Sequence, residues 1–272
     1  MKRTWLTPTT IIGFVALYVV IYIWQPGGVR LLISLTDALF VAFAVLASGL
    51  ALRASWMFER GVPARRVWLL FGVGLAMLTA ATSLWAYDRN FLDEPVPYPS
   101  PADILWALGY IPVLVSLWLQ YRALGVGISP RLKLTVLAVY SVMLAIIFVF
   151  LLWPILAEPG QVPAIEILLS AYSLIGDVIM AFIATLSLLV LWKGVVGRPW
   201  QYIVVSILLV VIADLAFSYA TWNKMYTTGS NLLSGFVDVV YLSAYVVAAA
   251  GGYRQITLSL PPVNEESFAE TH

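Results

Sequence analysis

Long runs of apolar residues, separated by short polar stretches, dominate the chain. A helix that crosses the hydrocarbon core of a membrane needs about 20 mostly apolar residues. Eight runs fit this length, and they cover residues 5–24, 31–52, 66–87, 101–121, 132–153, 165–192, 199–221 and 232–253. The pattern therefore predicts an all-α, polytopic membrane protein with eight transmembrane helices.

The stretches between the runs carry helix breakers and an uneven distribution of charge. Breaks such as Gln25-Pro26-Gly27-Gly28 and Glu158-Pro159-Gly160 combine proline with glycine, which favours turns. If the N-terminus is cytoplasmic, twelve of the lysines and arginines fall on the inner side, and the outer side holds Arg30, Arg89 and Lys224. By the positive-inside rule this favours a multi-pass protein of the cell inner (plasma) membrane with both termini cytoplasmic.

Composition agrees with this prediction and excludes several chemistries. Apolar residues make up 62% of the chain and charged residues 11%, which is too little charge to cover a water-soluble surface. There is no cysteine, and His272 is the single histidine, so thiolate metal sites, haem ligation by histidine and Ser-His-Asp catalysis lack their central residues. We expect no enzymatic activity, no cofactor and no metal site, and the absence of a basic run excludes nucleic acid as a partner.

The two halves of the chain resemble each other. A shift of 135 residues aligns the third and fourth runs with the seventh and eighth without a gap, and a shift of 139 aligns the second with the sixth. Among the polar residues that coincide under the first shift are Ser83, Asp103 and Tyr110 with Ser218, Asp238 and Tyr245. We expect two parallel four-helix repeats, residues 1–125 and 126–254, followed by a disordered cytoplasmic tail at 255–272.

Five aspartates lie within the predicted spans, and they form the candidate site. They are Asp37, Asp103, Asp177, Asp214 and Asp238, and all fall in the outer half or near the middle of the membrane. A carboxylate that faces lipid there costs several kcal/mol, so we expect these side chains to point into the bundle. They can form a polar pocket for a proton, a cation or an amine, or they can cap helices and bond to neighbouring hydroxyls. Capping is favoured for Asp103, because Ser100-Pro101-Ala102-Asp103 is typical of a helix start.

An acidic–aromatic motif, D-x-x-[W/Y]-x-x-x-Y, occurs once in each half. Its members are Asp103, Trp106 and Tyr110 in the first half and Asp238, Tyr241 and Tyr245 in the second. Offsets of three and seven place the three side chains on one helix face. The motif predicts either an aromatic-walled site for a cation or a contact that holds helices together.

The segment from Tyr98 to Trp106, followed by Tyr110, resembles a motif of multi-span sensor domains in bacterial signalling proteins. Those domains have about eight helices and usually precede GGDEF or histidine kinase modules. The resemblance implies a sensory role, with Pro99, Ser100, Asp103 and Tyr110 as the shared positions and no catalytic function attached to them. This chain has no such output module after Arg254, so a sensor of this kind would act through a separate partner.

Taken together, the sequence favours a non-enzymatic sensory or ligand-binding module in the membrane. Its partners would be membrane lipids and a protein at the cytoplasmic face or within the membrane. Two alternatives stay open at this point. One is a transporter of small molecules coupled to protons or cations, and the other is an accessory subunit that holds lipids or pigments in a larger membrane complex.

Overall fold

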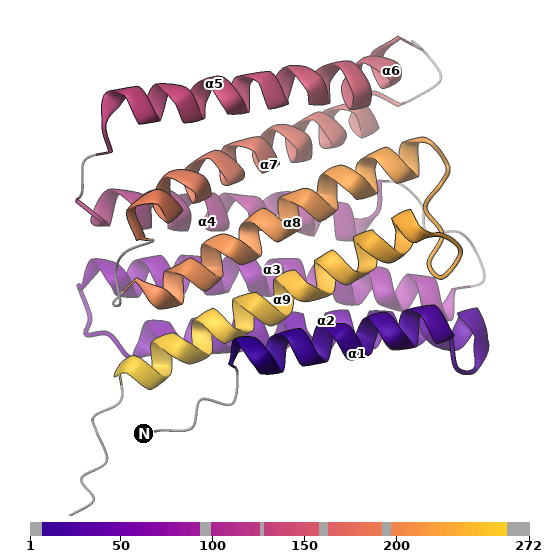
Figure 1. The fold of residues 1–272 in the computed structure, drawn as a ribbon, viewed down its shortest axis with the longest axis horizontal. Helices are drawn as coiled ribbons and strands as arrows, with labels where there is room; N and C mark the ends of the chain where they lie inside the picture. The colour runs from indigo at the N-terminus through magenta and orange to yellow at the C-terminus, as the bar shows by residue number, and fades with distance from the viewer. Residues whose placement is uncertain (1–6, 93–98, 126–127, 158–162, 192–196, 260–272) are drawn as a thin grey trace, which may run out of the picture.

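The computed structural model describes residues 7–92, 99–125, 128–157, 163–191 and 197–259, and every regular element in these ranges is a helix (Figure 1). In chain order the elements are α1 (Pro8–Trp24), α2 (Gly28–Trp56), α3 (Pro63–Phe91), α4 (Pro101–Ala123), α5 (Pro130–Ile147), the π-helix η1 (Phe148–Leu152), α6 (Trp153–Leu156), α7 (Ala164–Leu191), α8 (Arg198–Trp222) and α9 (Leu232–Ser259).

The helices confirm the prediction of an all-α, polytopic membrane protein. Seven of them are long and apolar enough to cross a membrane, when α5 and η1 are taken together as Pro130–Leu152. The remaining predicted span corresponds to α1, which is apolar but has 17 described residues. At 1.5 Å per residue α1 is about 25 Å long, slightly shorter than the hydrocarbon core of about 30 Å.

The helix of the fifth predicted span changes its winding near its end. In η1 the backbone N–H of Trp153 bonds to the carbonyl of Phe148, five residues back instead of four. Pro154 follows directly, and a proline has no N–H and displaces the carbonyl four residues before it. The π-turn is therefore a local response to Pro154 in an otherwise continuous rod.

Six helices form a flattened ring of two layers. Packing contacts give the order α2, α3, α4, α7, α8, α9, and α9 packs against α2 to close the ring. The layer of α2, α3 and α4 lies behind the layer of α7, α8 and α9 in Figure 1. Outside the ring, α1 packs against α9 and α5 packs against α7, so these two helices occupy opposite edges of the bundle.

The two ends of the ring differ in charge. At one end, here called the acidic end, α2, α4, α7 and α9 begin, and the buried aspartates lie on its side of the bundle. The opposite end, here called the basic end, carries most of the described cationic residues, namely Arg53, Arg60, Arg65, Arg66, Arg122, Arg131, Lys133, Arg198 and Arg254.

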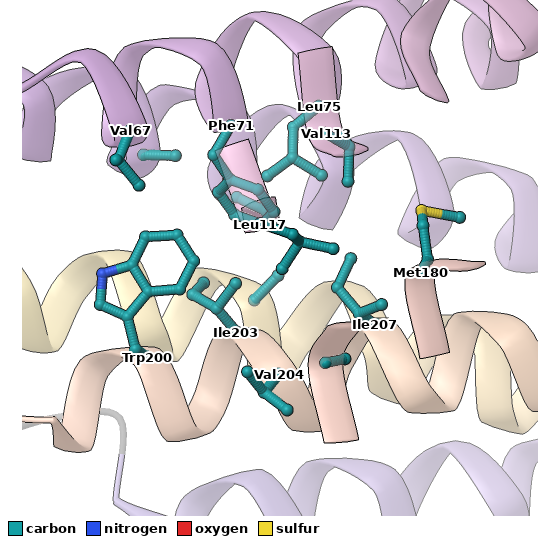
Figure 2. Packing of buried hydrophobic residues seen from close by; sticks show 14 of the residues in the cluster. Val67, Phe71, Leu75, Val113, Leu117, Met180, Trp200, Ile203, Val204 and Ile207 are labelled. Carbon is teal, nitrogen blue, oxygen red and sulfur yellow. The ribbon is translucent and has the colours of Figure 1, made fainter. Parts of the chain in front are cut away.

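Large apolar side chains fill the interior of the ring toward the basic end. Trp68 and Phe71 of α3 reach across the ring to Trp200 of α8, with ring centroids 5.0 and 6.0 Å apart. All three are buried, and Ile203 and Leu117 complete the contact between the layers. Figure 2 shows Phe71, Leu117, Trp200 and Ile203 in this core. The basic half of the ring is thus a tightly packed, mainly apolar core.

The last helix continues past the expected boundary at Arg254. Residues 255–259 belong to α9, and Ile256 is buried in the apolar core. The remainder of the expected tail, residues 260–272, lies outside the described residues.

Candidate functional site

The aspartates of the predicted site separate into two clusters and one isolated residue. Asp37, Asp177 and Asp238 are at most 3% exposed, and Asp214 is partly buried. Asp37 and Asp238 lie together near the acidic end, in what is here called the rim cluster. Asp177 and Asp214 meet deeper inside the ring, in the central cluster. Asp103 belongs to neither.

Asp103 is part of a helix cap. Its carboxylate accepts hydrogen bonds from the backbone N–H of Ser100 (2.6 Å) and from the Ser100 hydroxyl (2.8 Å), and the N–H of Asp103 points back to that hydroxyl. This capping box begins α4 immediately before Pro101. The structure therefore gives Asp103 the capping role that its sequence context favours.

The rim cluster contains an ion pair between two helices. The guanidinium of Arg89, at the end of α3, donates through Nε and Nη2 to the carboxylate of Asp37 on α2. It also donates through Nη1 to the hydroxyl of Thr228 (3.1 Å) and lies 4.4 Å from the centre of the Trp85 ring. Asn90 donates a further bond of 2.6 Å to Asp37. Both Asp37 oxygens are thus paired, and the charge of Asp37 is balanced.

Asp238 in the same cluster is held by two phenols. Tyr22 of α1 donates to one carboxylate oxygen (3.0 Å), and Tyr226 of the α8–α9 loop donates to the other (2.6 Å). Tyr22 also accepts the backbone N–H of Gly229, and Gln25 donates to the carbonyl of Gly229. These bonds attach α1 and the α8–α9 loop to α9 at the acidic end.

Tyr226 lies in the loop that closes over this end. Burial, together with the negative charge of the neighbouring Asp238, raises the pKa of the Tyr226 phenol above its ordinary value. The phenol therefore keeps its proton and stays a hydrogen-bond donor to Asp238 through the whole physiological pH range.

The central cluster joins four helices around two carboxyl groups. Tyr110 of α4 donates to Asp177 of α7 (2.7 Å) and also lies 3.3 Å from a carboxylate oxygen of Asp214 on α8. Tyr241 of α9 donates to the other oxygen of Asp214. Because α4 is not a ring neighbour of α8, the contact from Tyr110 to Asp214 crosses the interior between the two layers.

The two central carboxyls have no cationic partner among the described residues. The one salt bridge that the described residues form is that of Arg89 with Asp37 in the rim cluster. The Tyr110 hydroxyl lies 2.7 Å from Asp177 and 3.3 Å from Asp214, so the two carboxyls lie side by side around one phenol. Oδ2 of Asp177 is buried and receives no hydrogen bond from any described donor. The pair therefore needs positive charge, from a proton or a bound cation, that these side chains do not supply.

The close approach of Tyr110 to Asp177 depends on a glycine. A Cβ atom at Gly176 would lie 2.8 Å from Cδ1 and 3.0 Å from Cε1 of the Tyr110 ring. The absence of a side chain at Gly176 lets this ring lie against the backbone of α7 and brings its hydroxyl to the adjacent Asp177. The local sequence Gly176-Asp177 thus positions both partners.

Aromatic side chains lie between the central and the rim clusters. The ring of Phe217 lies 4.8 Å from Tyr226 and 6.4 Å from Tyr241, between centroids, and Phe40 lies 6.3 Å from Tyr241. Asp214 and Tyr241 are each partly exposed, so a water-sized molecule can touch them. Aromatic rings therefore lie beside the central cluster.

The repeated acidic–aromatic motif does not form a cluster within either helix. Tyr110 bonds to Asp177 and Asp214 instead of Asp103, and Trp106 is half-buried on the same helix. In the second copy Tyr241 bonds to Asp214, while Tyr245 lies 3.3 Å from the hydroxyl of Thr82 on α3. The tyrosines thus bond across helices. Tyr98, the first residue of the segment that resembles the sensor domains, lies outside the described residues.

Several residues of the clusters carry no strong signal in the sequence. Tyr22 and Phe217 lie in apolar runs where an aromatic residue is ordinary, and Tyr226 lies in a loop. The polar run Asp88-Arg89-Asn90 at the end of α3 is the one sequence feature that indicates a rim partner. In the part of the chain that the structure describes, no group of three or more metal-binding side chains comes together.

Comparison of the chain with protein-family models, with curated proteins and with solved structures finds no match.

Proposed function

We propose that this protein is a non-enzymatic sensory module of the membrane that binds a small ligand at the central cluster and acts through a partner protein. The observation that supports this most is the convergence of four helices on a carboxyl pair for which the described residues supply no counter-charge. Uncompensated ionisable groups inside a membrane are expensive and usually mark a functional site.

The difference between the two halves of the ring interior supports a ligand-binding site in preference to a transport path through the membrane. Polar groups gather toward the acidic end, whereas Trp68, Phe71 and Trp200 pack tightly across the ring toward the basic end. A transport path would need polar or open space on both sides of its binding site. A site whose polar groups lie toward one end fits a receptor, in which occupancy changes helix packing and the change is read at the other end.

The charge of the two ends indicates which end of the bundle faces the cytoplasm, and therefore where the partner would be contacted. We propose that the basic end faces the cytoplasm of the inner (plasma) membrane and contacts a protein partner and anionic lipids there. The chain has no cysteine, so single cysteines at Thr227 and Arg60 provide a clean test. A membrane-impermeant maleimide should label position 227 in intact cells and position 60 after permeabilisation, and the reverse pattern would overturn the orientation.

The ring order also supports the proposed duplication. A half-turn about the ring axis would carry α2, α3 and α4 onto α7, α8 and α9 while preserving the order of packing contacts. This agrees with the sequence shifts that align the same spans. Superposing the two triplets should give a rotation near a half-turn about an axis along the membrane normal, and a rotation far from that would remove the duplication from the proposal.

Native mass spectrometry of the protein, extracted gently from the membranes in which it is made, tests the binding function. We expect an additional bound mass that is lost from Asp177→Asn and from Asp214→Asn and retained by Asp103→Asn, whose carboxylate caps α4 away from the site. A ligand retained equally by all variants would place binding elsewhere. A ligand that accumulates inside proteoliposomes against its gradient would favour a transporter.

A further inference from the structure

We infer that the ligand of the central cluster is an organic ammonium ion, which takes the place of a proton shared by Asp177 and Asp214. This inference rests on the proposed function, because it names the chemical class of the ligand for the same site. It is carried by the oxygen of Asp177 that no described donor contacts, by the charge of the pair and by the rings around it.

The charge of the cluster requires a cation of some kind. Two carboxyls lie around the single Tyr110 hydroxyl, and the guanidinium of Arg89 already bonds to Asp37 and Thr228. Two adjacent ionised carboxylates in a membrane interior repel each other and lose their hydration. Without a ligand, one proton between Asp177 and Asp214 relieves this repulsion.

The hydrogen-bonding capacity of the cluster fits a donor-rich ligand. Tyr110 and Tyr241 supply the protein donors, and Oδ2 of Asp177 has no described donor although Asp177 is 1% exposed. The bond from Tyr110 to Asp214 is long, at 3.3 Å. A primary ammonium group brings three N–H donors, enough to reach the free oxygen of Asp177 and a carboxylate oxygen of Asp214 together.

The surroundings favour an organic cation over a metal ion. Phe40 and Phe217 both lie against Tyr241, and the ring of Tyr172 lies 6.1 Å from that of Tyr110. Aromatic faces attract organic ammonium ions and also cover their carbon substituents. Divalent metal ions prefer a larger set of oxygen ligands, and no group of three or more metal-binding side chains occurs among the described residues.

The exchange balances in protons and charge. Before binding, the pair holds one proton and one negative charge. When the ammonium ion enters, this proton leaves for the solvent, and two ionised carboxylates remain around one positive charge. The net charge of the cluster is unchanged, and each ligand bound releases one proton. Binding should therefore weaken as the pH falls.

The experiment measures this proton with the full-length protein in detergent. A pH-indicator dye in weakly buffered solution reports protons released during titration with methylammonium, benzylammonium, benzyl alcohol and sodium ions, and calorimetry reports binding. We expect at least one of the two ammonium compounds to bind with release of about one proton. Benzyl alcohol should release none, and sodium ions should not replace the amine.

Matched variants locate the effect. Asp177→Asn and Asp214→Asn should each weaken ammonium binding by at least about 100-fold, as expected when one partner of a buried charged contact is removed. Asp103→Asn should bind like the native protein. Because the native protein alone gives the proton count, the test stands even if an asparagine variant fails to fold.

Two results would overturn the inference. One is that neither ammonium compound binds or displaces a proton, and the other is that sodium ions or benzyl alcohol bind equally well at the same residues. The proposed function is tested separately. A neutral molecule that co-purifies with the protein and is lost from Asp177→Asn would refute the ammonium ligand and leave the binding function in place.

Discussion

Gly176→Ala should disrupt the central cluster through the Tyr110 ring. The new methyl group would lie 2.8 Å from Cδ1 of Tyr110, whereas ordinary contacts begin at 3.4 Å. The ring must therefore retreat by about 0.6 Å, and overpacking of this kind usually costs about 1–3 kcal/mol. Retreat also stretches the bond to Asp214, which is already 3.3 Å long, and the bond to Asp177.

The free energy of unfolding, measured by titration with SDS in mixed micelles, gives the size of this effect. We expect Gly176→Ala to lower it by about 1–3 kcal/mol. Gly49→Ala is the matched control, because a Cβ at Gly49 meets nothing within 4 Å. That substitution should be neutral or stabilising by up to about 1 kcal/mol, since alanine restricts the unfolded chain.

A double-mutant cycle assigns the cost to the ring. Removing the Tyr110 side chain in the same molecule should abolish most of the penalty of Gly176→Ala, with a coupling free energy of about 1–3 kcal/mol. If Gly176→Ala were as well tolerated as Gly49→Ala, or if its cost were unchanged in the Tyr110→Ala background, then Tyr110 would not lie against α7. The geometry of the central cluster would then be wrong.

Two further predictions concern the rim cluster. Arg89→Ala leaves the buried carboxylate of Asp37 without its cation and should lower the free energy of unfolding by about 3–5 kcal/mol, and adding Asp37→Asn should recover a large part of this loss in the same SDS titration. The second concerns Tyr226, whose pKa is raised above its ordinary value of 10.0, so the folded protein keeps this proton at a pH where the unfolded chain loses it. The stabilisation that follows is complete below about pH 10 and is lost as the pH rises further. The stability of Tyr226→Phe should therefore fall less steeply than that of the native protein above pH 10, and equal slopes would contradict the burial of Tyr226.

The membrane-spanning architecture could be predicted because lipid imposes a simple rule on sequence. Each span must be apolar over about 20 residues, and loops must contain residues that end helices. Local rules also sufficed for Asp103, because a capping box depends on neighbours within three residues of each other.

The composition of the two clusters depends on helix rotation and on contacts between distant parts of the chain. Tyr22 and Asp238 are 216 positions apart, and Tyr110 and Asp214 are 104 apart. Helix periodicity places Asp103, Trp106 and Tyr110 on one face, but it does not say which neighbour that face meets. The aspartates, Tyr110 and Tyr241 were thus predictable as candidate residues, while the pairing between them was not.

The closure of the ring by α9 against α2 has a consequence for how the protein is made. A chain inserted into the membrane from its N-terminus exposes Asp37 and Tyr22 long before α9 and the α8–α9 loop emerge from the ribosome. During that interval Asp37 can be neutralised by Arg89 of the nearby α3, but the phenol of Tyr22 lacks both Asp238 and Gly229. We therefore expect the first helices to stay an open half-ring in the membrane until α9 arrives and completes the acidic end.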